Sequence, residues 1–329
     1  MKRLNFLFVS AAVFAAALFF PLNGSCAGKA PSKHRGDIRI LYWNIQMGMW
    51  ADQEAEYANF RKWIKEYKPD ICVWCESGSY KKTSGKGSIP KDERYFPAGW
   101  KEFAASYGHK YMGISAVRDN FPQVITSRFP LSTVEVFDST GTPRPIWHGA
   151  GHHRIKMKGR VIDVVTCHPW PFSYSFEARK TPAQKESSAK KEGDEYRAFE
   201  MWYIVDHTIC NPEYAGAEWI LVGDMNSISR VDNHRYNLPE DSSQFLTQDV
   251  IRTRTDLVDV IGARNPGEFV SSTAKGTRRI DYIYLSPSLD ARVRSASIIK
   301  ETWVPVKYTG ISNYWIPSDH LPIVVDLKL

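Results

Sequence analysis

The chain has 329 residues, of which 13% are aromatic, and it carries a formal net charge of +7. This length provides for one large domain or two small ones, and the lack of any internal repeat or heptad run excludes repeat and coiled-coil architectures. The mild basic excess suits an anionic substrate, but it does not by itself indicate a nucleic acid.

The first residues are typical of a targeting segment. Lys2 and Arg3 precede an apolar run from Phe6 to Phe20, and Ser25-Cys26-Ala27 has the small-residue spacing of a signal-peptidase site. The apolar run is shorter than the roughly 20 residues that a membrane helix needs. We therefore expect residues 1–27 to be a signal peptide whose removal lowers the net charge from +7 to +5, and we expect a secreted or periplasmic protein.

Cys26 leaves a second form of export open. A thiol after small residues can carry a lipid, which would anchor the protein as a lipoprotein, although Asn23 stands where such signals usually hold an aliphatic residue. Residues 28–36 are predicted to be a linker, and residues 37–329 to form the folded domain.

After the linker, strand-like and helix-like segments alternate. Residues 38–44 predict a strand, and Tyr57, Phe60, Ile64 and Tyr67 then recur at the spacing of one helix face. Further strands are predicted at 71–76, 123–127, 134–137, 154–157, 160–168, 219–224, 280–286, 292–299 and 323–329, and a second helix at 195–210.

The order of these elements indicates the fold class. Lys158-Gly159 joins two short strands in the manner of a hairpin, whereas helices separate other strands. This mixture favours an α/β fold with partly antiparallel sheets. Residues 77–98 and 171–194 are predicted to be long loops, which often carry function. Cys72 and Cys75 would point to opposite faces of their strand, which argues against a CxxC site.

Polar residues stand at the ends of six predicted strands. A single Asn or Asp in such a place is an ordinary turn residue, but six together predict side chains that converge on one edge. The clusters are Trp43-Asn44-Ile45-Gln46, Glu76, Thr166-Cys167-His168-Pro169, Gly223-Asp224-Met225-Asn226, Ile280-Asp281-Tyr282 and Ser318-Asp319-His320.

These residue types suit the hydrolysis of a phosphate ester. Mg²⁺, or Mn²⁺ or Ca²⁺ in its place, binds carboxylate and amide oxygens, which Glu76 with Asn44 or Asp319 can supply. Such a cation neutralises charge on the phosphate oxygens. Histidine, with an unperturbed pKa of about 6.5, can donate or accept a proton at neutral pH, and Asp281 is the candidate partner that fixes the tautomer of His320.

In this order the motifs resemble the endonuclease/exonuclease/phosphatase superfamily, in its DNase I-like and sphingomyelinase-like branch. Ser127-Arg128-Phe129-Pro130 is similar to a further family segment, and the likeness extends from about Asp37 to Leu329. The resemblance implies a four-layer α-β-β-α sandwich, in which two packed mixed sheets lie between outer helices and the site lies at one end.

The resemblance also implies the metal ligands. Glu76 would be the main ligand, with Asn44 beside it and Asp319 completing the acidic site. Gln46 stands where the abasic-site repair branch would have a second metal-binding Asp, so the resemblance leaves a second metal ion in doubt.

The remaining motif residues would carry the proton transfers. His320 with Asp281 would form one acid–base pair, and His168 would be the second catalytic histidine. Asp224 and Asn226 would hold the nucleophilic water or the phosphate.

The substrate stays open at this level. A monomer with no obligate protein partner is expected to act on a nucleic acid, a phospholipid headgroup or a sugar phosphate. A phospholipid or sphingomyelin phosphodiesterase would need exposed apolar loops, for which Trp170, Phe172, Tyr174 and Phe176 are candidates, although these rings would equally well pack against the domain. A non-catalytic binding protein on the same scaffold is a remote alternative, because all six motifs are present. Arg279 is expected at the surface, outside the site.

Overall fold

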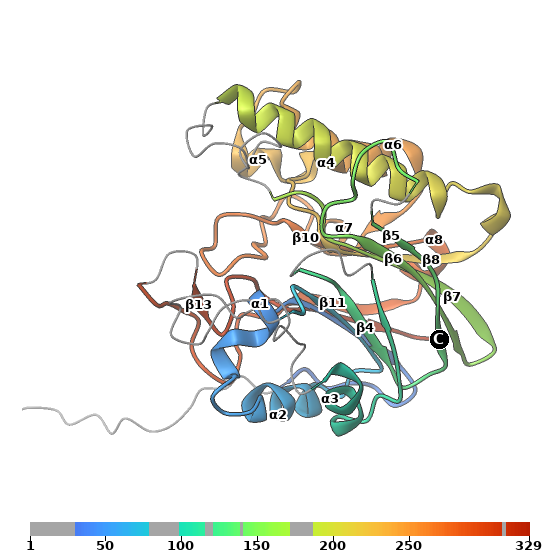
Figure 1. The fold of residues 1–329 in the computed structure, drawn as a ribbon, viewed down its shortest axis with the longest axis vertical. Helices are drawn as coiled ribbons and strands as arrows, with labels where there is room; N and C mark the ends of the chain where they lie inside the picture. The colour runs from blue at the N-terminus through green and yellow to red at the C-terminus, as the bar shows by residue number, and fades with distance from the viewer. Residues whose placement is uncertain (1–29, 79–98, 116–120, 139–140, 172–186, 311–313) are drawn as a thin grey trace, which may run out of the picture.

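The computed structural model describes residues 30–78, 99–115, 121–138, 141–171, 187–310 and 314–329. Over these residues two six-stranded sheets lie face to face, with helices on their outer sides (Figure 1). The predicted signal peptide lies outside the described residues, as do Phe172, Tyr174 and Phe176. No helix in the described part of the chain is long and apolar enough to cross a membrane.

Both sheets are mixed. In the first, β1 runs parallel to β2, and in the second, β7 runs parallel to β8, while the other pairs are antiparallel. The first sheet has the order β11 (Val293–Ile298), β14 (Ile323–Leu327), β1 (Ile38–Asn44), β2 (Ile71–Cys75), β4 (Val124–Ser127) and β3 (Tyr111–Ile114). The second has the order β5 (Leu131–Phe137), β6 (Ala150–Met157), β7 (Arg160–Cys167), β8 (Glu218–Asp224), β10 (Asp281–Leu285) and β9 (Val258–Asp259). A small hairpin pairs β12 (Lys307–Tyr308) with β13 (Trp315–Ile316).

The helices are short, with one exception. α4 spans Ser187–His207, and it lies with α6 over the second sheet, while α2 and α3 cover the first (Figure 1). The others are α1 (Gln46–Met49), α2 (Ala58–Tyr67), α3 (Trp100–Ser106), α5 (Asn233–Tyr236), α6 (Leu246–Arg254), α7 (Val260–Arg264) and α8 (Pro287–Asp290). Single 3₁₀ turns occur at Trp50–Asp52, Pro212–Tyr214, Arg230–Asp232 and Ser243–Phe245.

The side-chain alternation of β1 shows why the sandwich forms. Ile40 and Tyr42 point into the core between the two sheets, whereas Leu41 and Trp43 point outward onto α2 and α3. A strand with both faces covered is mostly apolar, and every residue of β1 is buried; its one charged side chain, Arg39, pairs with Asp326 at 2.7 Å. A third cluster seals the second sheet against α4 and α6, which confirms the predicted four layers.

The alternation of β2 also settles the cysteine question for this strand. Cys75 lies in the core between the sheets and Cys72 lies in the core beneath α2 and α3, so the two thiols occupy opposite faces as predicted. Both are free, as are Cys167 and Cys210.

The predicted strands and two helices are present, most of them with shifted ends, but several short elements, including β12, β13, α1, α5, α7 and α8, were not predicted. α4 begins at Ser187 instead of residue 195, so the second predicted loop is helical from residue 187 onward; the rest of it, 172–186, lies outside the described residues. The first turns of α4 are polar and lack the apolar spacing that predicts a helix. β3, β9, α3 and α6 were not predicted, because short or mainly polar segments carry little periodic signal.

The strand directions bring the motif residues to one end of the sandwich. Asn44 pairs in register with Cys75 on the parallel strand β2, so Asn44 and Glu76 leave the sheet together. In the second sheet, Asp224 at the end of β8 pairs with Asp281 at the start of the antiparallel strand β10. β14 is likewise antiparallel to β1, so the residues that precede it reach the same end.

Candidate active site

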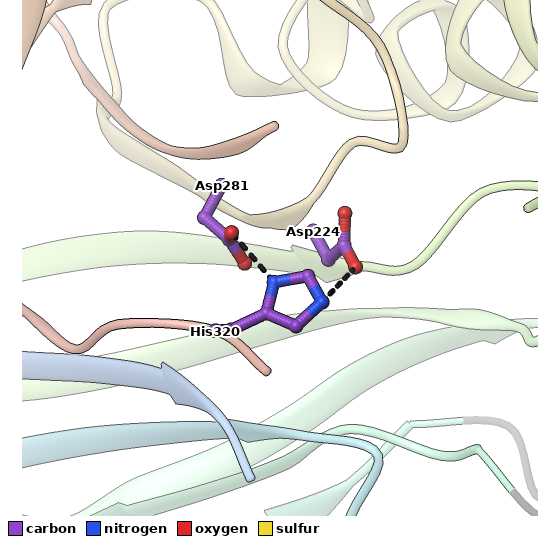
Figure 2. A group of neighbouring side chains, drawn as sticks. All are labelled: Asp224, Asp281 and His320. Atoms are coloured by element: carbon purple, nitrogen blue, oxygen red, sulfur yellow. Dashed lines mark hydrogen bonds and ion pairs between the residues drawn. The ribbon is translucent and has the colours of Figure 1, made fainter. Parts of the chain in front are cut away.

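His320 is held between two carboxylates (Figure 2). Its Nδ1 lies 2.7 Å from Oδ2 of Asp281, and its Nε2 lies 3.6 Å from Oδ2 of Asp224. Burial alone would lower the pKa of His320, but Asp281, Asp319 and Asp224 hold that pKa well above its ordinary value. The imidazole is therefore a charged group at neutral pH.

Asp281 is itself fixed from two further directions. The Tyr42 hydroxyl donates to Oδ1 at 2.7 Å, and the Ser272 hydroxyl donates to Oδ2 at 2.7 Å. Asp281 is fully buried, so these hydrogen bonds replace the water that the carboxylate loses. The orientation of His320 thus depends on a carboxylate that cannot rotate freely.

Asp224 lies between the two predicted catalytic histidines. Its Oδ2 is 3.6 Å from Nε2 of His320 and 3.6 Å from Nε2 of His168, and it accepts a hydrogen bond from Nδ2 of Asn44 at 3.1 Å. Burial and the neighbouring Asp281 raise the pKa of Asp224. A carboxylate in such a place is a stronger base than one at the surface.

Glu76 turns into the same space from the end of β2. Its backbone has a φ of 54°, and its side chain accepts from Asn44 Nδ2 at 3.2 Å and from the Met47 amide at 3.1 Å. Burial and the nearby Asp319 raise the pKa of Glu76 from 4.5 to about 7. The Asn44 oxygen accepts from the Gln46 amide at 3.1 Å, so the Asn44 amide bridges Glu76 and Asp224 through its NH₂ group.

The carboxylates fit a hard divalent cation. Burial raises the pKa of Asp319 although His320 opposes the shift, and Oδ1 of Asp319 is buried with no hydrogen-bond partner among the described residues. The pKa is raised at buried Asp224 and at half-buried Glu76 and Asp319, and one Asp319 oxygen is unsatisfied among the described residues; a bound cation stabilises such an arrangement. Asp281 is hydrogen-bonded to His320 at 2.7 Å and Asp224 lies 3.6 Å from both histidines, whereas Asp319 is farther from His320, at 3.9 Å.

A second cluster, formed by Asp224, Asp281 and His320, is less suitable for binding a cation. One ligand atom each of Asp224, Asp281 and His320 lies within 4.8 Å of the others. However, Nδ1 of His320 already contacts Asp281 at 2.7 Å, and a cation here would have to displace that hydrogen bond. The set around Glu76 and Asp319 therefore fits a cation better.

His168 has a different environment from His320. Its ring centroid is 4.5 Å from that of His148, and Phe121 lies edge-on at 6.3 Å. Burial and His148 lower the pKa of His168 from 6.5 to about 3, although Asp224 opposes the shift. His168 is therefore neutral at physiological pH.

The side chain of Asn226 is hydrogen-bonded to the backbone of the loop after β7. Its own amide donates to Oδ1 of Asp224 at 2.9 Å, and its side-chain Nδ2 donates to the carbonyl of Pro169 at 3.1 Å. It has a φ of 47°, which the short polar side chain of Asn tolerates better than most residues. Asn226 thus joins the segment that carries His168 to the end of β8.

Both predicted catalytic histidines, Glu76, Asp224, Asn226 and Asp319 line one cleft of about 550 Å³, whereas Asn44 and Asp281 are not among its lining residues. Lys275 and Arg278 contribute cationic side chains to its wall, and Thr273 and Thr277 contribute hydroxyls. The remaining lining residues are Gln46, Met47, Phe121, His148, Pro171, Ile280 and Trp315. The cleft is thus lined by carboxylates as well as by two cationic side chains. This combination suits a phosphate group that is bound through a metal cation.

The sequence profile of the endonuclease/exonuclease/phosphatase family matches residues 41–320, which include every predicted site residue. The chain belongs to this family. Members are metal-dependent phosphoesterases and nucleases, and the protein is an enzyme of that class, a hydrolase of phosphoric esters.

Solved structures share the fold of this family member at low sequence identity. An AP endonuclease from Archaeoglobus fulgidus is 18% identical over 89% of this chain and 100% of its own, with a TM-score of 0.55. A 3′ phosphatase, NExo, from Neisseria, bound to a product DNA hairpin, is 16% identical over 89% of this chain and 100% of its own, with a TM-score of 0.56. Truncated TDP2 from Caenorhabditis elegans is 14% identical over 88% of this chain and 97% of its own, with a TM-score of 0.56. No curated protein sequence matches the chain.

Arg279 and Trp170 are both buried in this endonuclease/exonuclease/phosphatase domain. Arg279 is buried, not at the surface, because its guanidinium pairs with Asp232 at 2.8 Å and Asp259 at 2.6 Å. Trp170 is 2% exposed and packs edge-on against Trp147 at 4.9 Å, so it is not an exposed lipid-contacting ring.

Several cleft residues of this family member were not singled out by the sequence. His148, Phe121 and Lys275 lie outside the family's short motifs, and no local pattern marks them. Gln46 was noted, and its side-chain oxygen accepts from Trp50 Nε1 at 3.1 Å and from the Trp315 amide at 3.2 Å. It thus ties the β12–β13 hairpin to the segment after β1.

Proposed function

We propose that the protein hydrolyses a phosphodiester bond with one divalent cation, and that His320 and His168 handle the protons. The observation that carries this proposal is the position of His320. Its Nδ1 is 2.7 Å from Asp281, while its Nε2 faces Asp224 in the cleft that Glu76 and Asp319 also line.

Glu76 and Asp319 would hold the cation, with Mg²⁺ as the first candidate. When bound, such a cation neutralises the charge that grows on the non-bridging phosphate oxygens. Asn44 would support the site by holding Glu76 and Asp224 in place through its NH₂ group, instead of offering its oxygen as a ligand.

His320 would act as the general acid. Because Asp281 keeps its Nδ1 proton in place, Nε2 can give its proton to the leaving oxygen as the P–O bond breaks. The raised pKa of His320 supports this role, because the group is protonated at the start of the reaction.

Asp224 and His168 would orient and deprotonate the attacking water. The water oxygen forms the new bond to phosphorus, and its proton passes to this pair, whose Oδ2 and Nε2 atoms are 3.6 Å apart. The raised pKa of Asp224 supports a basic role, and the lowered pKa of His168 keeps its ring neutral and able to share a proton. Asn226 would hold this region to Pro169 instead of binding phosphate directly.

The substrate is proposed at the level of a phosphodiester. A cleft of about 550 Å³ is in the range of small-molecule sites, and Lys275 and Arg278 provide cations for an anionic group beyond the scissile phosphate. The lipid alternative loses Trp170 as a contact residue, since that ring is buried. Export through residues 1–27 is also a proposal, which N-terminal sequencing of protein from the medium or periplasm would test.

The test is hydrolysis of bis-p-nitrophenyl phosphate, plasmid DNA and sphingomyelin by purified protein, each with Mg²⁺ and with chelator. We expect turnover of at least one substrate with Mg²⁺ and loss of turnover with chelator. Glu76→Gln should shift the Mg²⁺ concentration needed for half-maximal rate upward while the fold survives.

The matched control for the histidines is His234→Ala, because His234 is exposed and outside the cleft. It should keep full activity. Near-normal turnover by His320→Ala, or turnover that chelator leaves unchanged, would remove the proposed mechanism.

A further inference from the structure

His168 lacks the kind of partner that orients His320. The Nδ1 of His168 is buried and makes no hydrogen bond of normal geometry among the described residues, although the backbone of Phe121 weakly favours its charged form. A catalytic imidazole usually has its second nitrogen fixed by a carboxylate or a carbonyl. Packing therefore contributes to the direction of the His168 ring, together with Asp224 at 3.6 Å from its Nε2. The rings beside it are those of His148, at 4.5 Å and 35°, and Phe121, edge-on at 6.3 Å.

The two stacked histidines belong to different loops. His148 precedes β6 and His168 follows β7, and these strands pair in antiparallel register from Ala150 opposite Cys167. The loops are therefore neighbours at one end of the second sheet, but within the described part of the chain the pairing of β6 with β7 ends at Ala150 and Cys167, before either ring.

A single carboxylate from α4 joins these two loops. Oε1 of Glu200 accepts from the Trp147 amide at 2.6 Å, and Oε2 accepts from the Trp170 amide at 2.7 Å. Trp147 is the residue before His148, and Trp170 is the second residue after His168. Each oxygen of one fully buried side chain thus holds one loop, with the short distances of charge-assisted hydrogen bonds.

Neighbouring contacts make this junction stiff. The indoles of Trp147 and Trp170 meet edge-on at 4.9 Å, and Arg197, one turn earlier on α4, donates to the carbonyls of Trp170 and Pro171 at 3.0 and 3.1 Å. Arg197 is itself paired with Asp194. The loop after β7 therefore cannot move relative to α4 without breaking several buried contacts.

We propose that Glu200 is a positioning residue for the reaction: its two hydrogen bonds set the separation of the loops, and so hold the His148 ring against His168 and aim Nε2 of His168 at Asp224. Glu200 contacts neither substrate nor cation in this proposal. The inference rests on the proposed function for the consequence in catalysis, but its structural part concerns only the orientation of His168.

Glu200→Gln is the direct test, because the amide keeps the shape of the side chain but turns one acceptor into a donor that faces a backbone N–H. A misplacement of about 1 Å at a catalytic group can cost on the order of 10²-fold in rate, so we expect kcat for bis-p-nitrophenyl phosphate with Mg²⁺ to fall about 10- to 100-fold, with KM unchanged. In the His168→Ala background, Glu200→Gln should cost no further rate, because the ring that it positions is gone. Glu192→Gln, an exposed change on the same helix, should leave the rate as in the wild type.

NMR spectra of histidine-labelled protein separate this inference from the proposed function. The His168 ring signal, assigned by its loss in His168→Ala, should shift or broaden in Glu200→Gln, while the His320 signal stays in place. This outcome supports the positioning role even if His168→Ala proves to be fully active, in which case it is the proposed function that fails.

Three results would overturn the inference. One is an unmoved His168 signal in Glu200→Gln. The other two apply when His168→Ala itself loses activity: they are wild-type kcat in Glu200→Gln, or an equal loss of rate with and without His168. If Glu200→Gln does not fold, Glu200→Asp replaces it, because the shorter carboxylate keeps the charge but cannot reach both amides, and the same spectra and rates decide.

Discussion

The two histidines of the cleft are oriented by different means. His320 has a hydrogen-bonded carboxylate on Nδ1, and that carboxylate is held in turn by Tyr42 and Ser272. Among the described residues, Nδ1 of His168 has no such partner, and the ring lies against that of His148. One imidazole is thus oriented by a polar network on one side of Asp224, and the other imidazole is oriented largely by packed rings on the opposite side.

The difference also separates their charges. Three carboxylates outweigh burial at His320 and raise its pKa, whereas burial dominates at His168 and lowers its pKa to about 3. One fold therefore provides a charged and a neutral imidazole whose Nε2 atoms each lie 3.6 Å from Asp224. A pair of groups whose surroundings push their pKa values apart is suited to opposite proton transfers.

The largest effect is expected from removing either ring. His320→Ala and His168→Ala should each lower kcat by at least about 10²-fold, the usual scale of lost acid–base catalysis. Steady-state rates with bis-p-nitrophenyl phosphate and Mg²⁺ check this. A loss confined to one of the two variants would break the comparison, because it would leave the other histidine without a chemical role.

Asp281→Asn should have the next largest effect, of about 10-fold or more at alkaline pH. The pKa of His320 lies above its ordinary value, so a rate that needs protonated His320 falls only as pH rises through that raised pKa. Without the Asp281 charge the pKa drops, and the fall in rate moves to lower pH. A pH–rate profile measures this, and an unshifted alkaline limb would contradict the role of Asp281.

The contact between His148 and His168 should contribute less to the rate than Asp281 does. An aromatic contact of about 0.5–1.5 kcal/mol corresponds to roughly two- to tenfold in rate, so His148→Ala should lose about that much. His148→Phe keeps a ring in place and should retain most of the activity. Equal losses in the two variants would indicate that a nitrogen of His148, and not its ring face, is needed.

The last prediction concerns stability and not rate. The folded-state pKa of His168, about 3, lies below the value near 6.5 expected for the unfolded chain, so its contribution is fully present above pH 6.5 and is lost as pH falls toward 3. In metal-free protein, His168→Gln should reduce the slope of unfolding free energy against pH in this window by up to about 1.4 kcal/mol per pH unit. Urea unfolding at several pH values measures the slope, with His234→Gln as the exposed control; equal slopes in all three proteins would show that His168 is not buried neutral.

The sequence located the His320 side of the cleft better than the His168 side. Asp281 and His320 each stand in a short motif next to an apolar strand, and strand ends converge once the sheet order is known. The apolar run from Ile71 to Cys75 likewise predicted a buried strand, and all five residues of β2 are buried.

The supports of His168 could not be found in the same way. Glu200 lies 53 residues from Trp147 and 30 from Trp170 in the sequence. It binds their backbone amides, and because almost every residue has a backbone amide, no residue type in the sequence indicates these contacts. Within α4 it is one more polar residue beside the apolar Phe199 and Met201. Contacts of this kind depend on the tertiary arrangement, and the same holds for the hydroxyls of Tyr42 and Ser272 that fix Asp281.

The most direct measurement is an NMR titration of the histidine rings in metal-free protein, with the His168 and His320 signals assigned from the two alanine variants. We predict that His320 stays protonated to a pH above 6.5, while His168 stays neutral until the solution is strongly acidic. If the two rings titrate together near pH 6.5, or if His168 is the more basic, then their surroundings do not divide the acid and base roles between them.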